Sequence, residues 1–83
     1  SLEEQPEQLM ENVRAILDSA GMAFVDIVKF NAYCMSPEDI ITCAGIRNRF
    51  LDGTRTATTA VVVSGLADPA WKVEADLIAA RQD

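Results

Sequence analysis

The sequence contains no histidine and only two cysteines, Cys34 and Cys43. A structural zinc site usually needs four cysteine or histidine ligands, so the chain has too few of them for one. The absence of histidine also excludes catalytic triads and dyads in which histidine is the general base. Two isolated cysteines without secretory features are typical of reduced proteins, so we expect free thiols and a cytoplasmic setting. We also expect no metal or other cofactor.

Basic residues and long apolar runs are also scarce. Seven lysines and arginines stand against 13 acidic residues, giving a net charge of −6. That balance argues against binding to a phosphate backbone, and no apolar run approaches the ~20 residues of a membrane helix. We therefore expect neither nucleic acid nor a membrane as a partner. The 83 residues predict a single domain, and a core of that size is marginal, so self-association is the expected source of further stability.

The first helix is predicted from an apolar face with helical spacing that ends at Gly21. That face contains Leu9, Met10, Val13, Ile16, Leu17 and Ala20. Its start has two interpretations. Ser1 and Glu4 can form a capping box, or Pro6 is the first helical residue and the helix begins near position 5.

The second helix is predicted from a strong start signal at Ser36-Pro37-Glu38-Asp39, which combines a capping serine, a first-position proline and two acids. It is expected to end at Asp52-Gly53. Gly45 lies inside it at a cost of about 1 kcal/mol relative to alanine, which suggests that the helix packs closely there.

Three strands are predicted, over residues 28–34, 56–63 and 71–80. In the first, Val28, Phe30, Ala32 and Cys34 form the apolar face. The element order α-β-α-β-β predicts an α+β fold with two helices packed on one face of a mixed sheet. We expect the first two strands to be parallel and the last two antiparallel across their short connection. The three valines at 61–63 suggest a strand covered on both faces, and the sheet face without helices requires another subunit or additional strands.

Four segments then resemble, in order, the RidA/YjgF family. They are Ser1-Leu2-Glu3-Glu4-Gln5, Asp26-Ile27-Val28-Lys29, Ser36-Pro37-Glu38-Asp39 and Leu66-Ala67-Asp68-Pro69-Ala70-Trp71-Lys72-Val73-Glu74. The resemblance covers nearly the whole chain and implies a chorismate-mutase-like homotrimer with small-molecule clefts between subunits. Many members hydrolyse reactive enamines and imines to 2-oxo acids and ammonia. The family usually begins with a β-hairpin before the first helix, so the chain looks N-terminally truncated, processed or naturally short.

The resemblance also implies where the site residues lie. The arginine that holds the substrate carboxylate in the family's deaminases corresponds to Thr58, which cannot make that forked cationic contact. Arg55 is the candidate replacement; the alternative is a solvated basic residue. The neighbouring cysteine or other small residue corresponds to Ala60, and the family's asparagine on the second helix corresponds to Ala44.

The family's water-orienting acid corresponds to Asp76, the candidate general base, although an exposed strand charge is the alternative interpretation. Glu74 is a weaker candidate on the same strand face. Tyr33 is a candidate proton donor and ligand-binding residue, or else an interface aromatic.

Three functional hypotheses follow. The leading one is a RidA/YjgF-like homotrimer whose clefts bind a small carboxylate of the 2-oxo or 2-imino acid type, with imine deaminase activity weak or absent. The second is an active 2-iminobutanoate/2-iminopropanoate deaminase that uses Arg55. The third is a non-catalytic assembly or regulatory module. Ribonuclease activity or inhibition of translation, described for some members, ranks lowest because of the net charge of −6.

Overall fold

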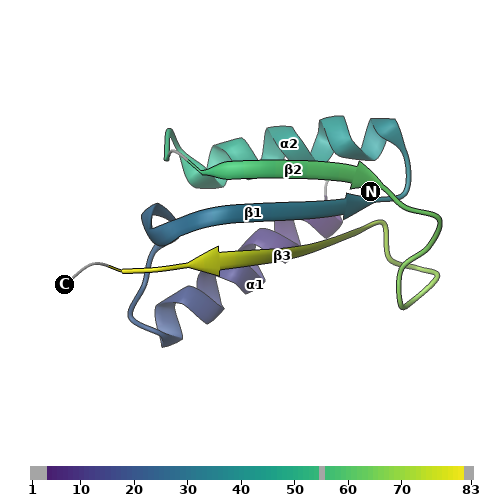
Figure 1. The fold of residues 1–83 in the computed structure, drawn as a ribbon. Helices are drawn as coiled ribbons and strands as arrows, with labels where there is room; N and C mark the ends of the chain where they lie inside the picture. Colours follow the sequence, from purple (N-terminus) through teal and green to yellow (C-terminus); the bar gives the residue numbers. More distant parts are fainter. Residues whose placement is uncertain (1–3, 55, 82–83) are drawn as a thin grey trace.

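The computed structural model of the chain describes residues 4–54 and 56–81. Two helices lie on one face of a three-stranded sheet (Figure 1), as the sequence predicted. In chain order the elements are α1 (Glu4–Ser19), the short 3-10 helix η1 (Phe24–Asp26), β1 (Ile27–Cys34), α2 (Pro37–Leu51), β2 (Ala57–Val62) and β3 (Val73–Ala79). The architecture is α+β, with α-β-α-β-β order.

The strand order is β2-β1-β3, which places β1 in the centre of the sheet. β1 and β2 are parallel across α2, which confirms that prediction. The last two strands run in opposite directions, but they are not neighbours: β3 pairs antiparallel with β1. Because β1 carries most of the buried apolar side chains of the sheet, both later strands pack beside it and neither pairs with the other.

A register shift at the start of β1 changes which residues face the helices. The pairing with β3 is irregular between Ile27 and Lys29. Ile27 is buried, whereas Val28 is 51% exposed. The sequence pattern had placed Val28 on the apolar face, and that prediction was wrong because a bulge adds a residue and resets the alternation. From Phe30 onward the predicted alternation holds.

The helix ends follow the predicted signals. Ser36 caps α2, since the Asp39 N–H donates to Ser36 Oγ at 3.1 Å. Asp52 and Gly53 both adopt positive φ directly after α2. Gly21, also at positive φ, follows α1. The Ser1 cap lies outside the described residues.

The structure decides between the two interpretations of the start of α1. Because α1 already includes Glu4, Pro6 is not the first helical residue; it is buried within the first described turn. Gly45 is exposed, and a Cβ atom placed on it would meet nothing within 4 Å. Close packing therefore does not explain this glycine.

The core lies between the helices and the sheet. It consists of Met10, Val13 and Leu17 of α1, Ile27, Phe30, Ala32 and Cys34 of β1, and Cys43, Ile46 and Leu51 of α2. Cys34 and Cys43 are both buried and free, with their sulfurs 3.8 Å apart. Burial in this apolar layer raises the pKa of the Cys43 thiol to about 12, with Cys34 a smaller cause.

The other side of the sheet, which we call the open face, has none of the helices of residues 4–54 and 56–81 over it (Figure 1). Cross-strand partners project to the same face, so the register assigns nine residues to it. They are Lys29, Asn31 and Tyr33 of β1, Ala57, Thr59 and Val61 of β2, and Glu74, Asp76 and Ile78 of β3. Val61 is 40% and Val62 48% exposed, so the residues that the structure describes do not provide the expected cover on both faces of β2.

Candidate functional site

A polar cluster lies on the open face where β1 and β3 pair. Asn31 is the register partner of Asp76, and Tyr33 is two residues further along the same face of β1. Asn31 Nδ2 donates to Asp76 Oδ1 at 2.8 Å, and the Tyr33 hydroxyl donates to Asp76 Oδ2 at 2.6 Å. Each carboxylate oxygen therefore has one fixed donor and keeps further accepting capacity for a water or ligand.

These hydrogen bonds shift both ionisable groups. The bond from Tyr33, and then the bond from Asn31, lowers the pKa of Asp76, because both donors stabilise the charged carboxylate. The same bond to Asp76 raises the pKa of Tyr33, with smaller contributions from desolvation, from the Asp76 charge and from Glu74. At neutral pH the cluster is thus an oriented carboxylate beside a protonated phenol.

The structure brings together two of the residues singled out in the sequence, Tyr33 and Asp76, and adds a third, Asn31. Sequence reasoning missed Asn31. The signal that could have found it is the alternation of β1, which places Asn31 on the same face as Tyr33. Glu74 is the register partner of Tyr33, so it lies beside the cluster on the open face and is exposed.

Thr58 and Ala60 lie on the opposite side of the sheet. Their register partners are Phe30 and Ala32, which are buried against the helices. Ala60 packs against the core, while Thr58 is exposed. Within one chain, therefore, Thr58 and Asp76 are on opposite faces, on strands separated by β1. Arg55 lies outside the described residues.

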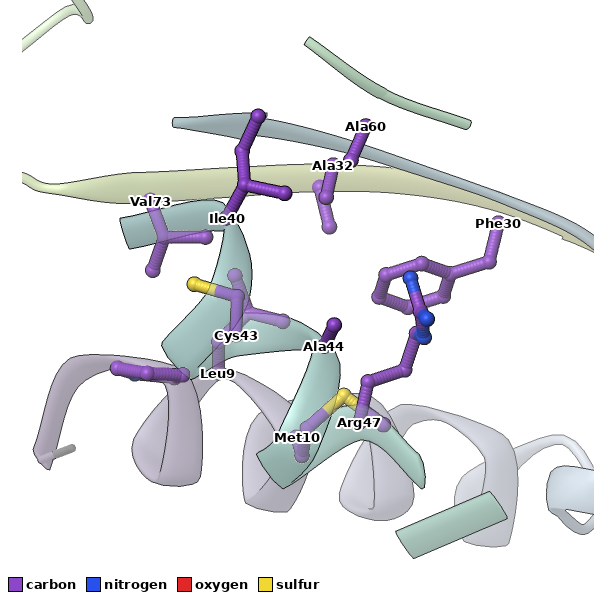
Figure 2. Close-up of a pocket in the computed structure, with 12 residues that line it drawn as sticks. Leu9, Met10, Phe30, Ala32, Ile40, Cys43, Ala44, Arg47, Ala60 and Val73 are labelled. Carbon is purple, nitrogen blue, oxygen red and sulfur yellow. The ribbon is translucent and has the colours of Figure 1, made fainter. Parts of the chain in front are cut away.

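A cavity of about 20 Å³ lies between the helices and the sheet, next to Ala60. Figure 2 shows its walls, which are almost entirely apolar. Its lining includes Phe30 and Ala32 of β1, and Cys43, Ala44 and Arg47 of α2. Arg47 is the one charged residue among the described lining residues, and sequence reasoning did not identify it.

The described residues contain neither a cluster of metal ligands nor a membrane-spanning helix. In the ranges 4–54 and 56–81, no group of three or more histidine, cysteine, aspartate or glutamate side chains is placed to hold a metal ion. Across those same ranges, no helix has the length and apolar character needed to span a membrane.

Comparison with curated proteins shows two similar relatives at moderate identity. The putative regulator AldR of Lactococcus lactis is 36% identical over 66 residues, which is 80% of this chain and 52% of that protein. A RutC family protein of Pyrococcus abyssi is 31% identical over 65 residues, covering 78% of this chain and 51% of that protein. The chain thus spans about half the length of the curated relatives it matches.

Comparison with solved structures supports the same fold. A putative endoribonuclease of Thermotoga maritima superposes with a TM-score of 0.92 at 26% identity, covering all of this chain and 65% of the other. Escherichia coli TdcF with bound serine superposes with a TM-score of 0.89 at 27% identity, covering 99% and 66%. These likenesses confirm the chorismate-mutase-like fold that the resemblance implied.

The family model described as Endoribonuclease L-PSP matches residues 1–81, nearly the whole chain. The motifs quoted from the sequence, the observed fold and these relatives agree with that match. The chain therefore belongs to the Endoribonuclease L-PSP family, the RidA/YjgF family that its motifs indicated.

Proposed function

We propose that the chain forms a homotrimer whose clefts between subunits bind small 2-oxo or 2-imino acids, with imine deaminase activity weak or absent. The observation that carries the proposal is the ionised Asp76 held by Tyr33 and Asn31 on the open face. The resemblance to the family assigns the position of its arginine to Thr58, which has no charge to offer a substrate carboxylate.

The open face supports the assembly. A three-stranded sheet with one uncovered face is rarely stable on its own. Here that face mixes the polar cluster with apolar side chains: Val61 is 40% exposed and Ile78 is 58% exposed. Apolar residues interspersed with satisfied polar groups are typical of subunit interfaces. Trimer formation would bury these side chains and add to the marginal stability expected for the core of an 83-residue chain.

The opposite orientations of Asp76 and Thr58 bear on how a cleft is built. No single chain presents both residues to one ligand, because one lies on the open face and the other on the helix-covered side. A site that uses both must therefore take the Asp76 cluster from one subunit and the Thr58 side of β2 from its neighbour. This geometry favours a cleft between subunits over a pocket within one.

The chemistry of the cluster fits imine hydrolysis in outline. Asp76 can accept a hydrogen bond from a water and orient it toward an imine carbon. Water adds to that carbon, the C–N bond breaks, and ammonia leaves with a 2-oxo acid as the other product. Thr58 cannot hold the substrate carboxylate, so binding in a reactive pose is weakened and turnover is slow. The bound serine of TdcF is a small amino acid with a carboxylate, in keeping with this ligand class.

Three other hypotheses have less support. An active deaminase requires Arg55, which lies outside the described residues, to take the place of the arginine. A non-catalytic assembly module would use the open face alone. RNA cleavage, which the family description names, would require binding to a polyanion by a chain of net charge −6.

Free thiols at Cys34 and Cys43 are in keeping with a cytoplasmic setting.

The assembly is tested by light scattering after size-exclusion chromatography. We expect three times the 9.0 kDa mass of one chain. Val61→Asp places a charge on the open face and should give monomers. Ile41→Asp, at an exposed position of α2 (74% exposed), is the matched control and should leave the trimer intact. A wild-type monomer at micromolar concentration would contradict the proposal.

Binding and turnover are tested separately. Titration calorimetry with 2-oxobutanoate should show binding to the trimer and much weaker binding to the Val61→Asp monomer. Ammonia release from freshly generated 2-iminobutanoate should be slow, and Asp76→Asn should abolish whatever exceeds uncatalysed hydrolysis. Absence of 2-oxobutanoate binding by the wild-type trimer would leave the non-catalytic module as the better hypothesis.

A further inference from the structure

Arg47 occupies an unusual place for an arginine. It lies on α2, partly buried, and its side chain rises from the helix toward the sheet on the side where Phe30 lies (Figure 2). The other described residues around that cavity are apolar or cysteine. A guanidinium next to such walls loses hydration, which makes an anionic partner more favourable than it would be in water.

No carboxylate supplies that partner within the part of the chain that the structure describes. The Arg47 side chain donates only to the neutral Asn48 Oδ1, from Nε at 3.4 Å and from a terminal nitrogen at 3.3 Å. The other arginines of the helices differ in this respect: Arg14 pairs with Glu11 at 3.0 Å and Arg49 with Glu7 at 3.6 Å. Arg47 thus keeps an unneutralised charge and most of its five donors for a ligand.

The neighbours of Arg47 leave room for a small ligand. Ala44 and Ala60 line the same cavity and have short side chains. Thr58 is two residues before Ala60 on the same face of β2 and is exposed. The enclosed space itself, about 20 Å³, holds no more than a water or a methyl-sized group, so a larger ligand must keep its head at the entrance.

We propose that Arg47 is a carboxylate-binding residue, which holds a small monocarboxylate at the entrance of this cavity while a short apolar tail of the ligand points toward Ala60. The guanidinium fork matches a carboxylate with two parallel hydrogen bonds, and the alanine walls accept an alkyl group. Arg47 would then supply from α2 the cation that Thr58 cannot supply from β2. The inference rests on the proposed function for the ligand class, and it assigns the anchoring charge to a residue that the family motifs did not indicate.

The test uses the full chain with 2-oxobutanoate and its uncharged amide as probes, measured by titration calorimetry. Arg47→Met keeps the length of the side chain and removes its charge, so it should weaken 2-oxobutanoate binding at least about tenfold. Arg47→Lys keeps the charge but loses the two parallel hydrogen bonds of a guanidinium, so its affinity for 2-oxobutanoate should lie between those of wild type and Arg47→Met. Arg49→Met removes a surface cation of the same helix (61% exposed) and should change nothing. The uncharged amide lacks the carboxylate that Arg47 would hold. Its affinity for wild type should therefore not exceed the affinity of 2-oxobutanoate for Arg47→Met.

Each outcome decides the inference. Wild-type affinity in Arg47→Met, or equal binding of the acid and the amide, would overturn it while leaving the proposed clefts in place. Absence of 2-oxobutanoate binding by the wild-type protein would overturn both. Circular dichroism and the oligomeric mass show whether Arg47→Met is folded. If Arg47→Met is not folded, Arg47→Lys is the decisive variant. If Arg47→Lys binds 2-oxobutanoate and its amide with the same affinities as wild type, the bidentate contact between Arg47 and the carboxylate is rejected. Amide-proton shifts at Ala44 and Ala60 on ligand addition provide the location.

Discussion

The Tyr33 hydroxyl lies 2.6 Å from Asp76 Oδ2, joining residues 43 positions apart in the sequence across the β1–β3 pair. Tyr33 and Asp76 therefore titrate as partners. The bond favours protonated Tyr33 and ionised Asp76, so the pKa of the phenol is raised and that of the carboxyl is lowered. On the acid side, the stabilisation from ionised Asp76 is present above its unfolded pKa near 3.8 and is lost as the pH falls through the lower folded value. On the basic side, the Tyr33 contribution is present below pH 10 and is lost as the pH rises through the raised folded value.

Removing the Tyr33 hydroxyl should move the titration of Asp76. Tyr33→Phe removes the hydrogen bond that lowers the Asp76 pKa most, so this pKa should rise toward its ordinary value. The remaining bond from Asn31 should still hold it somewhat low. Side-chain carboxyl carbon shifts followed by NMR between pH 2 and 6 measure this. Asn31→Ala should give a smaller rise. An unchanged Asp76 pKa in Tyr33→Phe would contradict the hydrogen bond as the cause.

The two buried thiols should be unreactive in the native protein. With a pKa of about 12, only ~10⁻⁴ of the Cys43 side chain is thiolate at pH 8, about a thousandfold less than for an unperturbed cysteine. Cys34 is fully buried, and desolvation raises its pKa as well. Ellman's reagent at pH 8 should therefore react slowly with the native protein and fully with both thiols in denaturant. Rapid native reaction would show that the core opens readily.

Gly45 and Gly53 should respond to alanine in opposite ways. Gly45 lies in the helix interior with open space around its Cα, so Gly45→Ala should stabilise the fold by about 1 kcal/mol. Gly53 has φ of +80°, where a Cβ is strained, so Gly53→Ala should destabilise by about 1 kcal/mol. Urea titrations at one protein concentration measure both. A loss of stability in Gly45→Ala would indicate that another subunit approaches this helix.

Much of the fold could be predicted because its signals are local. The Ser36-Pro37 start of α2 and the alternation of β3 depend on neighbours in sequence, and both were predicted correctly. The bulge at Val28 and the pairing of β3 with β1 could not be predicted, because they depend on which distant strand offers the better buried partner.

The same distinction between local and long-range signals applies to the candidate site. Asp76 and Tyr33 were identified one at a time, but the bond between them needs the strand order, and so does the addition of Asn31. Arg47 belongs to no motif, and the sequence of α2 does not indicate which of its two arginines, Arg47 or Arg49, faces a cavity. Its position emerges only from the packing of α2 on the sheet.

The last prediction concerns catalysis and Thr58. Wild-type turnover of 2-iminobutanoate should be at least about 100-fold below that of an arginine-bearing relative, since a lost charged contact of a few kcal/mol is worth that much in rate. Thr58 is exposed, so Thr58→Arg adds a guanidinium without disturbing the core, and it should raise turnover provided that Asp76 remains.

Ile41→Arg is the control for that variant. It adds the same charge at an exposed position of α2, away from the open face, and it should not raise turnover. The double variant Thr58→Arg/Asp76→Asn should lose the gain, because the water-orienting carboxylate is gone. If wild type already equals the arginine-bearing relative, Thr58 is not the position that limits turnover, and Arg47→Met and Arg55→Ala become the decisive variants. If Thr58→Arg stays inactive in a folded trimer that binds 2-oxobutanoate, aspartate at position 76 is too short to place the water, and binding is the function that remains.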